Sequence, residues 1–307
     1  MTGMEVLQRR RSARASSFAL HTLRARGRDG SVLELVAKDL SPGSMLDEAR
    51  RVRPEFLMDA SREAGVYRHV LDPDRHGTPR CVAVEEGTAG PVLVLEHVRG
   101  APLEELATGP PWLQAGRWLA SFQTERFAGP EPGPEVGLLV YDDTYFARWP
   151  ERAVEITRRQ GHAAAADIAA LHRSYDAVTA LLRAQPRVLV HGDFHPSNIV
   201  VSEDDARICV VDWEMAGRGP VLLDLAALTS GAWKPARRDA VVQAYRDALG
   251  GNLADWAHDD AFAPALEACR MHLAMQWLGW AVAWEPEPRR RYDWAAVALD
   301  SARRLGM

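Results

Sequence analysis

Three short apolar runs stand close together in the second half of the chain, at residues 187–190 (RVLV), 199–201 (IVV) and 208–211 (ICVV). Each run has the length of a buried strand, and polar segments separate the runs. Pro196 lies in the first separating segment and blocks a helix there. The pattern therefore predicts a loop after the first strand and a hairpin formed by the other two, with polar side chains at their ends.

The rest of the pattern predicts strands towards the N-terminus and helices towards the C-terminus. Residues 32–40 (VLELVAKDL) and 91–98 (PVLVLEHV) are apolar runs of strand length. Apolar positions recur at helical spacing over residues 54–71, and again over 112–122 and 156–182. Together these elements predict a chain of the α+β class.

Three polar side chains accompany the apolar runs of the second half. Asp193 lies in the predicted loop, Asn198 follows five residues later, and Asp212 comes directly after the last run. Carboxylate and carbonyl oxygens are the ligands that Mg²⁺ prefers, and this ion completes its coordination with water and nucleotide phosphates. A loop carboxylate that does not bind metal is able to accept a hydroxyl proton. We therefore predict Asp193 as a catalytic base, and Asn198 and Asp212 as Mg²⁺ ligands, as in kinase-type phosphoryl transfer.

These motifs resemble those of the phosphotransferase enzyme family that includes aminoglycoside and choline kinases. The resemblance rests on HGDFHPSN at residues 191–198, on DWE at residues 212–214, and on GRGPVLLDLAAL, which contains Gly217, Gly219 and Asp224. Protein kinases carry Arg at the position of Gly192 and Phe-Gly after the metal-binding aspartate. The sequence therefore favours a small-molecule acceptor over a protein.

The resemblance implies a two-lobed protein-kinase-like fold of the α+β class, with a small antiparallel sheet in the N-terminal lobe and a larger, mainly helical C-terminal lobe. We expect the nucleotide-binding lobe at residues 1–98, a hinge at about 95–100, and the catalytic and substrate-binding lobe at residues 99–307. A chain of 307 residues is longer than one hydrophobic core usually supports, which agrees with two domains.

The nucleotide-binding lobe is expected to contain a phosphate-binding lysine. The chain has two lysines, Lys38 and Lys234, and Lys38 lies in a predicted strand. A flexible ammonium contacts phosphate as a point charge. By resemblance, Lys38 binds the nucleotide phosphates and Glu63, on a predicted helix, pairs with it. Glu55 and Glu48 are alternative partners, and a solvent-exposed charge is the alternative interpretation of each residue.

The apolar run that ends near residue 96 is the expected hinge. By resemblance its main chain meets adenine, and we assign that contact to the backbone of Glu96 and Val98; an ordinary strand and loop is the alternative. The sequence contains neither GxGxxG nor GxxxxGK[ST]. The candidate phosphate flap is therefore a hairpin between residues 15 and 36, with Ser17 near its start and Gly30 at its turn.

Charge and cysteine content indicate a cytoplasmic protein. The net charge of -5 and the pI near 6.1 give no reason to expect a nucleic acid or an anionic membrane as a partner. Cys81, Cys209 and Cys269 show no metal-ligand or disulfide spacing, which fits a reducing compartment. The basic N-terminus is not followed by an apolar signal segment, and no apolar run is long enough to cross a bilayer. We expect a monomer or a homodimer.

A hydrolase is the competing chemistry for the HGDFHP segment. His191, Asp193 and His195 stand at alternate positions there, which is one pattern of metal ligands. Such a site needs further ligands, and the two later histidines of the chain lie in no matching motif. We therefore interpret His191 as a buried support of the loop and Asp224 as a structural brace or helix cap.

An acidic pair and a tryptophan stripe each have a structural and a substrate-binding interpretation. Adjacent Asp142 and Asp143 are typical of a helix cap or a solvated turn, with binding of a polyamine as the alternative. Trp277, Trp280 and Trp284 recur at helical spacing, which is typical of core packing. An aromatic wall for a cation or a sugar is the alternative.

The sequence thus predicts a kinase that moves the γ-phosphoryl group of ATP or GTP, with Mg²⁺, to a hydroxyl group of a small molecule. By resemblance, antibiotic phosphotransferases of the aminoglycoside type are the best match, with antibiotic resistance as the implied role. A kinase of a metabolite such as choline, a sugar or homoserine is an alternative, and so is a nucleotide-binding pseudokinase that regulates a partner. The full set of chemical residues favours an active enzyme.

Overall fold

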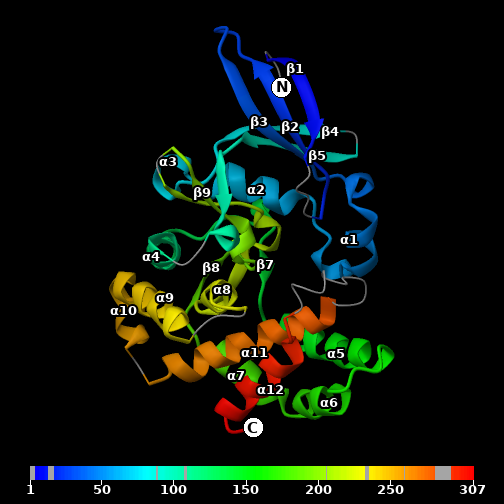
Figure 1. Ribbon diagram of the computed structural model, residues 1–307, viewed down its shortest axis with the longest axis vertical. Helices are drawn as coiled ribbons and strands as arrows, with labels where there is room; N and C mark the ends of the chain where they lie inside the picture. The colour runs from blue at the N-terminus through cyan, green and yellow to red at the C-terminus, as the bar shows by residue number, and fades with distance from the viewer. Residues whose placement is uncertain are drawn as a thin grey trace. The chain divides into compact units, whose positions relative to one another are not determined.

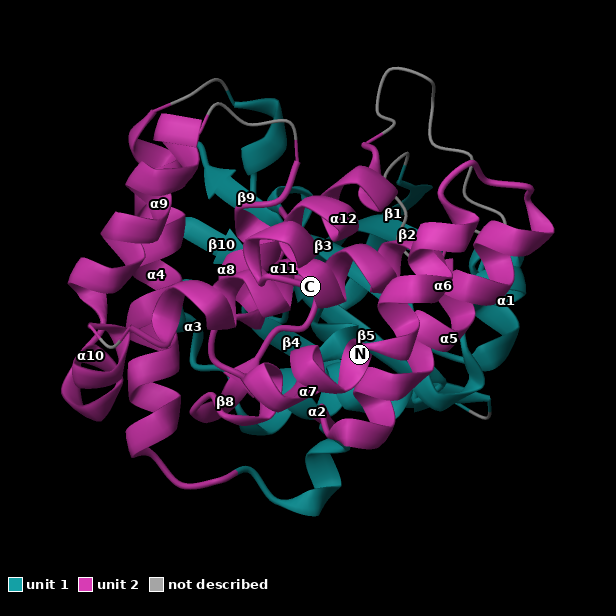
Figure 2. Ribbon diagram, turned by 90° about the horizontal axis from the view of Figure 1, so that it is seen from below, with its two compact units in different colours: residues 1–107, 132–138, 196–216 teal, residues 108–131, 139–195, 217–307 magenta. Residues whose placement is uncertain are grey.

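The structure is a computed structural model that describes residues 4–12, 17–87, 89–106, 109–204, 206–231, 235–258, 260–280 and 292–307, without the side chain of Glu48. The chain divides into two compact units, coloured teal and magenta in Figure 2. Unit 1 comprises residues 1–107, 132–138 and 196–216, and unit 2 comprises residues 108–131, 139–195 and 217–307. A lobe boundary near residue 98 stays a prediction.

Unit 1 contains an antiparallel sheet with strand order β1-β2-β3-β5-β4 and a smaller sheet with order β10-β9-β6 (Figure 1). Its strands are β1 (Glu5–Arg11), β2 (Leu20–Arg26), β3 (Val32–Asp39), β4 (Cys81–Gly87), β5 (Gly90–Glu96), β6 (Gly100–Pro102), β9 (Ile199–Ser202) and β10 (Ile208–Val210). Its helices are α1 (Asp47–Val52), α2 (Ser61–His69) and α3 (Pro73–His76). Its 3₁₀ turns are η1 (Pro42–Ser44), η2 (Glu55–Leu57), η3 (Leu103–Glu105), η4 (Pro134–Val136), η5 (Pro196–Asn198) and η6 (Trp213–Met215).

An apolar cluster covers one face of the larger sheet. Leu23, Ala25, Leu35 and Val94 are all buried in this cluster, and they come from β2, β3 and β5. Side chains alternate between the two faces of a strand, so Lys38 lies on the face of β3 opposite to Leu35. The strand therefore uses one face for packing and delivers the lysine to the other.

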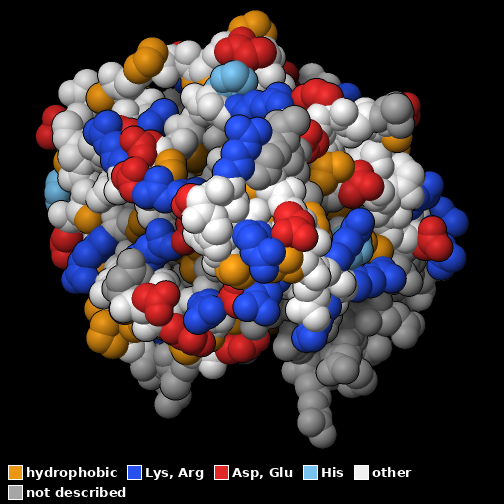
Figure 3. Space-filling view, turned by 90° about the horizontal axis from the view of Figure 1, so that it is seen from above, with side chains coloured by type: hydrophobic (Ala, Val, Ile, Leu, Met, Phe, Trp, Pro, Cys, Tyr) orange, Lys and Arg blue, Asp and Glu red, His pale blue; other side chains and the backbone are white. Residues whose placement is uncertain are grey.

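Charged side chains on the surface are of mixed sign. Figure 3 shows basic and acidic side chains interspersed over the face it presents. Arg26 of β2 pairs with Glu5 of β1 at 3.1 Å, and Arg99, which precedes β6, pairs with Glu34 of β3 at 3.0 Å; all four side chains are exposed. Exposed pairs of this kind contribute little to stability, so the apolar cluster carries most of the stability of the sheet.

Unit 2 is mainly helical and also contains a small sheet of order β7-β11-β8 (Figure 1). The strands are β7 (Leu139–Val140), β8 (Arg187–Val190) and β11 (Gly217–Pro220). The helices are α4 (Pro110–Ala128), α5 (Asp143–Arg159), α6 (Ala165–Arg173), α7 (Tyr175–Arg183), α8 (Leu223–Leu228), α9 (Pro235–Ala248), α10 (Gly251–Ala257), α11 (Phe262–Trp280) and α12 (Trp294–Arg304). Helix α11 is buried over most of its length and packs against α5, α8 and α12, so it forms the centre of this unit.

The predicted α+β class, with an antiparallel sheet towards the N-terminus and helices towards the C-terminus, is confirmed. The predicted hairpin is also confirmed, because β9 pairs with β10 in an antiparallel ladder that aligns Ile199 with Val210. Strand β8, by contrast, pairs with β11 in the sheet of unit 2. The predicted loop after β8 therefore begins in unit 2 and ends in unit 1.

The helix predicted over residues 54–71 is interrupted in the structure. The turn η2 occupies its first part, and α2 begins only at Ser61. Asp59 accepts hydrogen bonds from the backbone N–H of Ser61 at 2.9 Å and from its hydroxyl at 2.6 Å. Such local bonds between side chain and backbone compete with helix, so the regular helix starts after Asp59. Glu63 consequently lies in α2, whereas Glu55 lies before it.

None of the described helices is both long enough and apolar enough to span a membrane.

Candidate active site

Lys38, Glu63 and Asp212 meet inside unit 1. The Nζ atom of Lys38 lies 2.7 Å from Oε2 of Glu63 and 2.7 Å from Oδ1 of Asp212. The side chains of Lys38 and Glu63 are 5% and 3% exposed, and that of Asp212 is 16% exposed. The predicted phosphate-binding lysine, its predicted partner and one predicted metal ligand thus form a single cluster.

Each member of the cluster comes from a different element. Lys38 lies in β3, where its backbone is flanked by Leu20 of β2 and Leu93 of β5. Glu63 lies in the first turn of α2. Asp212 follows β10 directly and has a left-handed backbone, with φ of 67°. The position of the Lys38 ammonium is thus set by a central strand, whereas the positions of its two partner carboxylates depend on how α2 and the segment after β10 pack.

The electrostatics of the cluster keep Lys38 charged. Burial lowers the pKa of Lys38, but the carboxylates around its ammonium raise it more, so the net shift is upward. Burial raises the pKa of Glu63 to about 7, and the charge of Lys38 offsets this only in part. The neighbouring carboxylates act in the same direction as burial on Glu63. The cluster therefore holds more acid than one ammonium neutralises.

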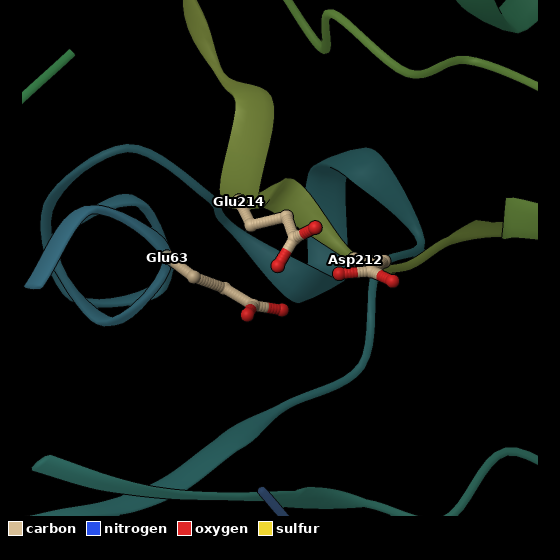
Figure 4. A group of neighbouring side chains, drawn as sticks. All are labelled: Glu63, Asp212 and Glu214. Atoms are coloured by element: carbon tan, nitrogen blue, oxygen red, sulfur yellow. The ribbon is translucent and has the colours of Figure 1, made fainter. Parts of the chain in front are cut away.

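Glu214 is a fourth member of this cluster, and its place in DWE did not by itself indicate a role. Its Oε2 atom lies 4.0 Å from Nζ of Lys38, and its Oε1 atom lies 3.0 Å from Nη1 of Arg53. Ser17 donates a hydrogen bond to the same Oε1 atom at 2.8 Å. The signal in the sequence was an acid two residues after Asp212. Figure 4 shows the carboxylates of Glu63, Asp212 and Glu214 pointing towards one another.

The oxygen atoms of this region suit a magnesium ion. Among the residues that the structure describes, Glu63, Asp212 and Glu214 each offer a carboxylate oxygen, and these oxygens lie within 4.8 Å of one another. Asn198 is close in the hairpin, because its carbonyl accepts a hydrogen bond from Val211, the residue before Asp212, at 3.0 Å. Carboxylate and carbonyl oxygens are hard ligands that fit Mg²⁺. The predicted ligands Asn198 and Asp212 thus belong to one end of one hairpin.

Asp193, the predicted base, lies in unit 2, in a loop whose backbone is hydrogen-bonded to Asp224. The carboxylate of Asp224 accepts hydrogen bonds from the backbone N–H of His191 at 2.7 Å and of Gly192 at 2.9 Å. The backbone N–H of Asp193 donates to Nδ1 of buried His191 at 3.2 Å. Gly192 has φ of 80°, which favours glycine at this position. Asp224 and His191 therefore act as the predicted brace and support.

The ring of His195 is neutral and bonded to a tryptophan. Burial lowers the pKa of His195 to about 4, and the neighbouring His191 lowers it as well. Nε1 of Trp277 lies 3.3 Å from Nε2 of His195. Because indole N–H is only a donor, Nε2 is the acceptor and the ring proton resides on Nδ1. His191 thus takes part in a hydrogen bond of the loop, as expected of a structural support, and His195 bonds to Trp277.

The expected hinge lies at the end of β5. The backbone N–H of Glu96 donates to the carbonyl of Arg80 at 2.9 Å, and the Glu96 side chain pairs with Arg207 at 2.8 Å. The adenine contacts assigned to the main chain of Glu96 and Val98 stay predictions.

Glu55 and Glu48 were the alternative partners of Lys38, and residues 15–36 form the expected flap; the structure describes both in part. Among the residues that the structure describes, the carboxylates within 4.0 Å of the Lys38 ammonium are those of Glu63, Asp212 and Glu214, whereas Glu55 lies in η2. The side chain of Glu48 lies outside the described residues. Ser17 is described and contacts Glu214, whereas residues 13–16, at the start of the expected flap, lie outside the description. The flap turn occurs as predicted between β2 and β3, where Gly30 has φ of 82°.

The acidic pair and the tryptophans have structural partners within unit 2. Asp142 caps α5 by accepting from the backbone N–H of Tyr145 at 2.9 Å. Asp143 pairs with Arg183 at 3.1 Å on the wall of a pocket of about 480 Å³. The rings of Trp277 and Trp294 stack with their centroids 5.4 Å apart, and the ring centroids of Trp280 and Trp149 are also 5.4 Å apart. Trp284 lies outside the described residues. The cap and packing interpretations hold for the residues described.

The sequence of residues 24–262 matches the family described as the phosphotransferase enzyme family, and this match spans more than half of the 307 residues. The chain belongs to this family. Membership confirms that it is a small-molecule phosphotransferase that acts on a hydroxyl group. The curated proteins contain no match to the chain.

Solved structures share the fold of this family member. A macrolide 2′-phosphotransferase from Brachybacterium faecium is 20% identical, with a TM-score of 0.56 over 96% of this chain and 94% of that one. A GDP complex of an aminoglycoside 2′-phosphotransferase-IIIa is 13% identical, with a TM-score of 0.60 over 98% and 92%. A choline/ethanolamine kinase family protein from Mesorhizobium loti is 18% identical, with a TM-score of 0.55 over 97% and 87%. At these identities the likeness concerns the fold alone.

Proposed function

We propose that this phosphotransferase moves the γ-phosphoryl group of ATP or GTP, in a Mg²⁺-dependent reaction, to a hydroxyl group of an antibiotic of the aminoglycoside type. The observation that carries the proposal is the buried ammonium of Lys38 between the carboxylates of Glu63 and Asp212. Burying such a cluster costs desolvation energy and adds little to stability, so it points to a function. The GDP complex of one protein of the same fold supports a nucleotide as the donor.

In the proposed reaction the residues of unit 1 bind the nucleotide. Lys38 contacts the phosphates as a point charge, and Glu63 holds the direction of its side chain. Asn198 and Asp212 are the proposed ligands of Mg²⁺, and the main chain of Glu96 and Val98 is the proposed contact of the base. A bound Mg²⁺ ion would neutralise charge on the phosphates. Most of the acceleration is then electrostatic and comes from groups already in place.

Asp193 is the proposed catalytic base of unit 2. The acceptor oxygen forms a bond to the γ-phosphorus, the bond from that phosphorus to the β,γ-bridging oxygen breaks, and the nucleoside diphosphate leaves with the electron pair. The hydroxyl proton passes to the carboxylate of Asp193. The brace by Asp224 keeps the loop in one conformation, which preserves the orientation of the base. A cytoplasmic location and a monomeric or homodimeric state belong to the same proposal.

A binding assay and a transfer assay test this proposal together. The melting temperature is measured with ATP or GTP, each with and without Mg²⁺. Phosphate transfer is then screened over aminoglycosides, macrolides, sugars, choline and homoserine. Asp193→Asn is the matched control, because it retains the nucleotide-binding residues of unit 1 and loses the proposed base. We expect Mg²⁺-dependent stabilisation in both proteins, and transfer to an aminoglycoside that is at least about 10²-fold faster in the wild type.

Each other outcome selects a different function. Transfer to choline, a sugar or homoserine in place of antibiotics identifies a metabolite kinase. Stabilisation by nucleotide without transfer to any acceptor supports a nucleotide-binding pseudokinase. Absence of stabilisation by either nucleotide contradicts the proposed role of the Lys38 cluster.

A further inference from the structure

Two buried arginines, Arg53 and Arg62, contact Glu214, and neither is a proposed ligand of nucleotide or metal. Nη1 of Arg62 donates to the backbone carbonyl of Glu214 at 2.9 Å, and Nη1 of Arg53 pairs with the Glu214 carboxylate at 3.0 Å. Their side chains are 4% and 3% exposed. Hydrogen bonds from a charged donor are about twice as strong as neutral ones, so one residue of η6 is held by its backbone and by its side chain.

Arg62 connects helix α2 to the segment that carries Asp212. It directly precedes Glu63, and its Nε atom donates to the carbonyl of Gly137 at 2.7 Å. Gly65 brings the same helix close to η4, since a Cβ atom at this position would lie 2.9 Å from the carbonyl oxygen of Val136. Glu63 thus lies between two positions of α2 that are each seated against the backbone of residues 136–137.

Arg53 holds one oxygen of the Glu214 carboxylate, which lies beside Lys38. Its Nε and Nη2 atoms donate to the carbonyl of Leu57 at 3.3 and 3.1 Å, and its Nη1 atom also donates to Ser17 Oγ at 2.9 Å. These bonds fix the guanidinium, which in turn holds Oε1 of Glu214. The other oxygen of Glu214 lies only 4.0 Å from the Lys38 ammonium. Without Arg53, the hydroxyl of Ser17 would be the remaining described partner of Oε1, and the negative charge of Glu214 would have Lys38 as its nearest described cation.

We propose that Arg53 and Arg62 are positioning residues that clamp α2 to the Asp212 segment through Glu214, so that the Lys38–Glu63 pair is assembled before nucleotide binds. This inference rests on the proposed function for its effect on catalysis, but the clamp itself is a property of the free protein. Arg62 sets the position of Glu63, and Arg53 prevents Glu214 from competing for Lys38. A site assembled in advance avoids reorganisation during the reaction.

Hydrogen exchange of the amides of α2 tests the role of Arg62 in the nucleotide-free protein. Arg62→Met keeps the length of the side chain and removes its donors. Arg68→Met is the matched control, because Arg68 lies on the same helix and its 41% exposed side chain pairs with Glu86. We expect the amides of α2 to be strongly protected in the wild type without nucleotide. Their protection factors are expected to fall by at least about tenfold in Arg62→Met but not in Arg68→Met.

Two results overturn the clamp. One is an α2 helix of the wild type that becomes protected only after MgATP is added, and the other is equal exchange in Arg62→Met and Arg68→Met. If Arg62→Met does not fold, Arg62→Lys replaces it, because a lysine side chain reaches one of the two carbonyls and not both. The amides of α2 are then expected to be less protected than in the wild type but not fully exposed. Unchanged protection overturns the clamp. These measurements need no phosphate transfer, so they remain decisive if the proposed function fails.

A rescue experiment tests the role of Arg53. Arg53→Met is expected to lower the rate of MgATP hydrolysis, with water as the acceptor, by at least about tenfold, because Glu214 then occupies Lys38. Adding Glu214→Gln removes the competing charge and is expected to restore the rate to within about threefold of Glu214→Gln alone. The melting temperature is measured beside the rate, because a merely structural arginine predicts that rate and melting temperature are lost and restored together. Failure of rescue in a folded double variant overturns this role.

Discussion

Asp212 combines an uncommon backbone with a central contact. Its φ of 67° lies in the left-handed region, which most residues with a side chain avoid and which Asp and Asn tolerate best. Its carboxylate accepts a hydrogen bond from Lys38 at 2.7 Å. Residues held in such conformations persist where the surrounding structure imposes them, and they concentrate at functional sites. The backbone geometry therefore supports the role that the sequence pattern assigned to this aspartate.

Substitution of Asp212 tests the metal assignment. We expect Asp212→Ala to abolish the part of the ATP affinity that depends on Mg²⁺, because a carboxylate ligand is lost. Asp212→Asn is the matched variant, since asparagine tolerates the left-handed backbone but carries no charge. Calorimetric titration with ATP, with and without Mg²⁺, measures the effect in both. Unchanged Mg²⁺-dependent affinity in the two variants would remove Asp212 from the metal site.

Substitution of Asp193 separates binding from chemistry. We expect Asp193→Asn to lower kcat by at least about 10²-fold, the low end of the effect of losing a general base. Nucleotide affinity is expected to stay close to that of the wild type, because Lys38, Glu63 and Asp212 are unchanged. Steady-state kinetics with the acceptor found in the screen give both values. Retained turnover would show that another group accepts the proton.

The loop that carries Asp193 depends on an element that follows it by about thirty residues in the chain. Asp224, at the start of α8, accepts from two consecutive backbone N–H groups of the loop, those of His191 and Gly192. Burial raises the pKa of Asp224 to about 7, although both donors lower it. The sequence indicated a brace at this position, and the structure shows which backbone groups it holds.

Removal of this brace is expected to destabilise the loop. Asp224→Ala leaves two buried N–H groups without their acceptor, and each such group costs roughly 1–3 kcal/mol. Asp224→Asn retains one carbonyl oxygen and is expected to lose less. Urea denaturation of both variants gives the change in the free energy of unfolding. Equal stabilities of the alanine and asparagine variants would contradict the assigned hydrogen bonds.

Some strands and helices follow from the local pattern of apolar and polar residues, and others do not. Strands β8, β9 and β10 agree with the apolar runs because a short run between polar segments has few other ways to be buried. The predicted start of the helix over residues 54–71 was wrong. Ser61 donates hydrogen bonds to Asp59, and α2 begins only at Ser61. The periodic pattern indicated which side chains are buried, and the local hydrogen bonds between Asp59 and Ser61 precede the point where the regular helix begins.

The core of unit 2 contains a buried histidine that links stability to pH. His272 of α11 is fully buried, and its Nδ1 atom lies 2.8 Å from the hydroxyl of Tyr175 in α7. Burial lowers the pKa of His272 from 6.5 to about 3. The unfolded chain therefore binds a proton below pH 6.5 that the folded chain rejects. Stability contributed by the neutral ring is present above this pH and is lost as the pH falls.

Replacement of His272 by asparagine is expected to reduce this pH dependence. Asparagine does not titrate, and it offers Tyr175 a partner near the position of Nδ1. Between pH 6.5 and about 3, the wild type loses roughly 1.4 kcal/mol per pH unit through this group alone. The difference in Tm between wild type and His272→Asn should therefore shrink as the pH is lowered from 7 to 4. Calorimetric melting curves that stay parallel over this range would contradict the assignment.

The amino-acid sequence was enough to identify the family, the fold class, the β9–β10 hairpin and the polar residues that these elements carry, because spacing along one segment depends on near neighbours. It left open which of three glutamates meets Lys38, and it passed over Arg53 and Glu214. Lys38 and Asp212 are 174 positions apart. Contacts across such separations depend on how α2, β3 and the segment after β10 pack together, and no local pattern records that packing.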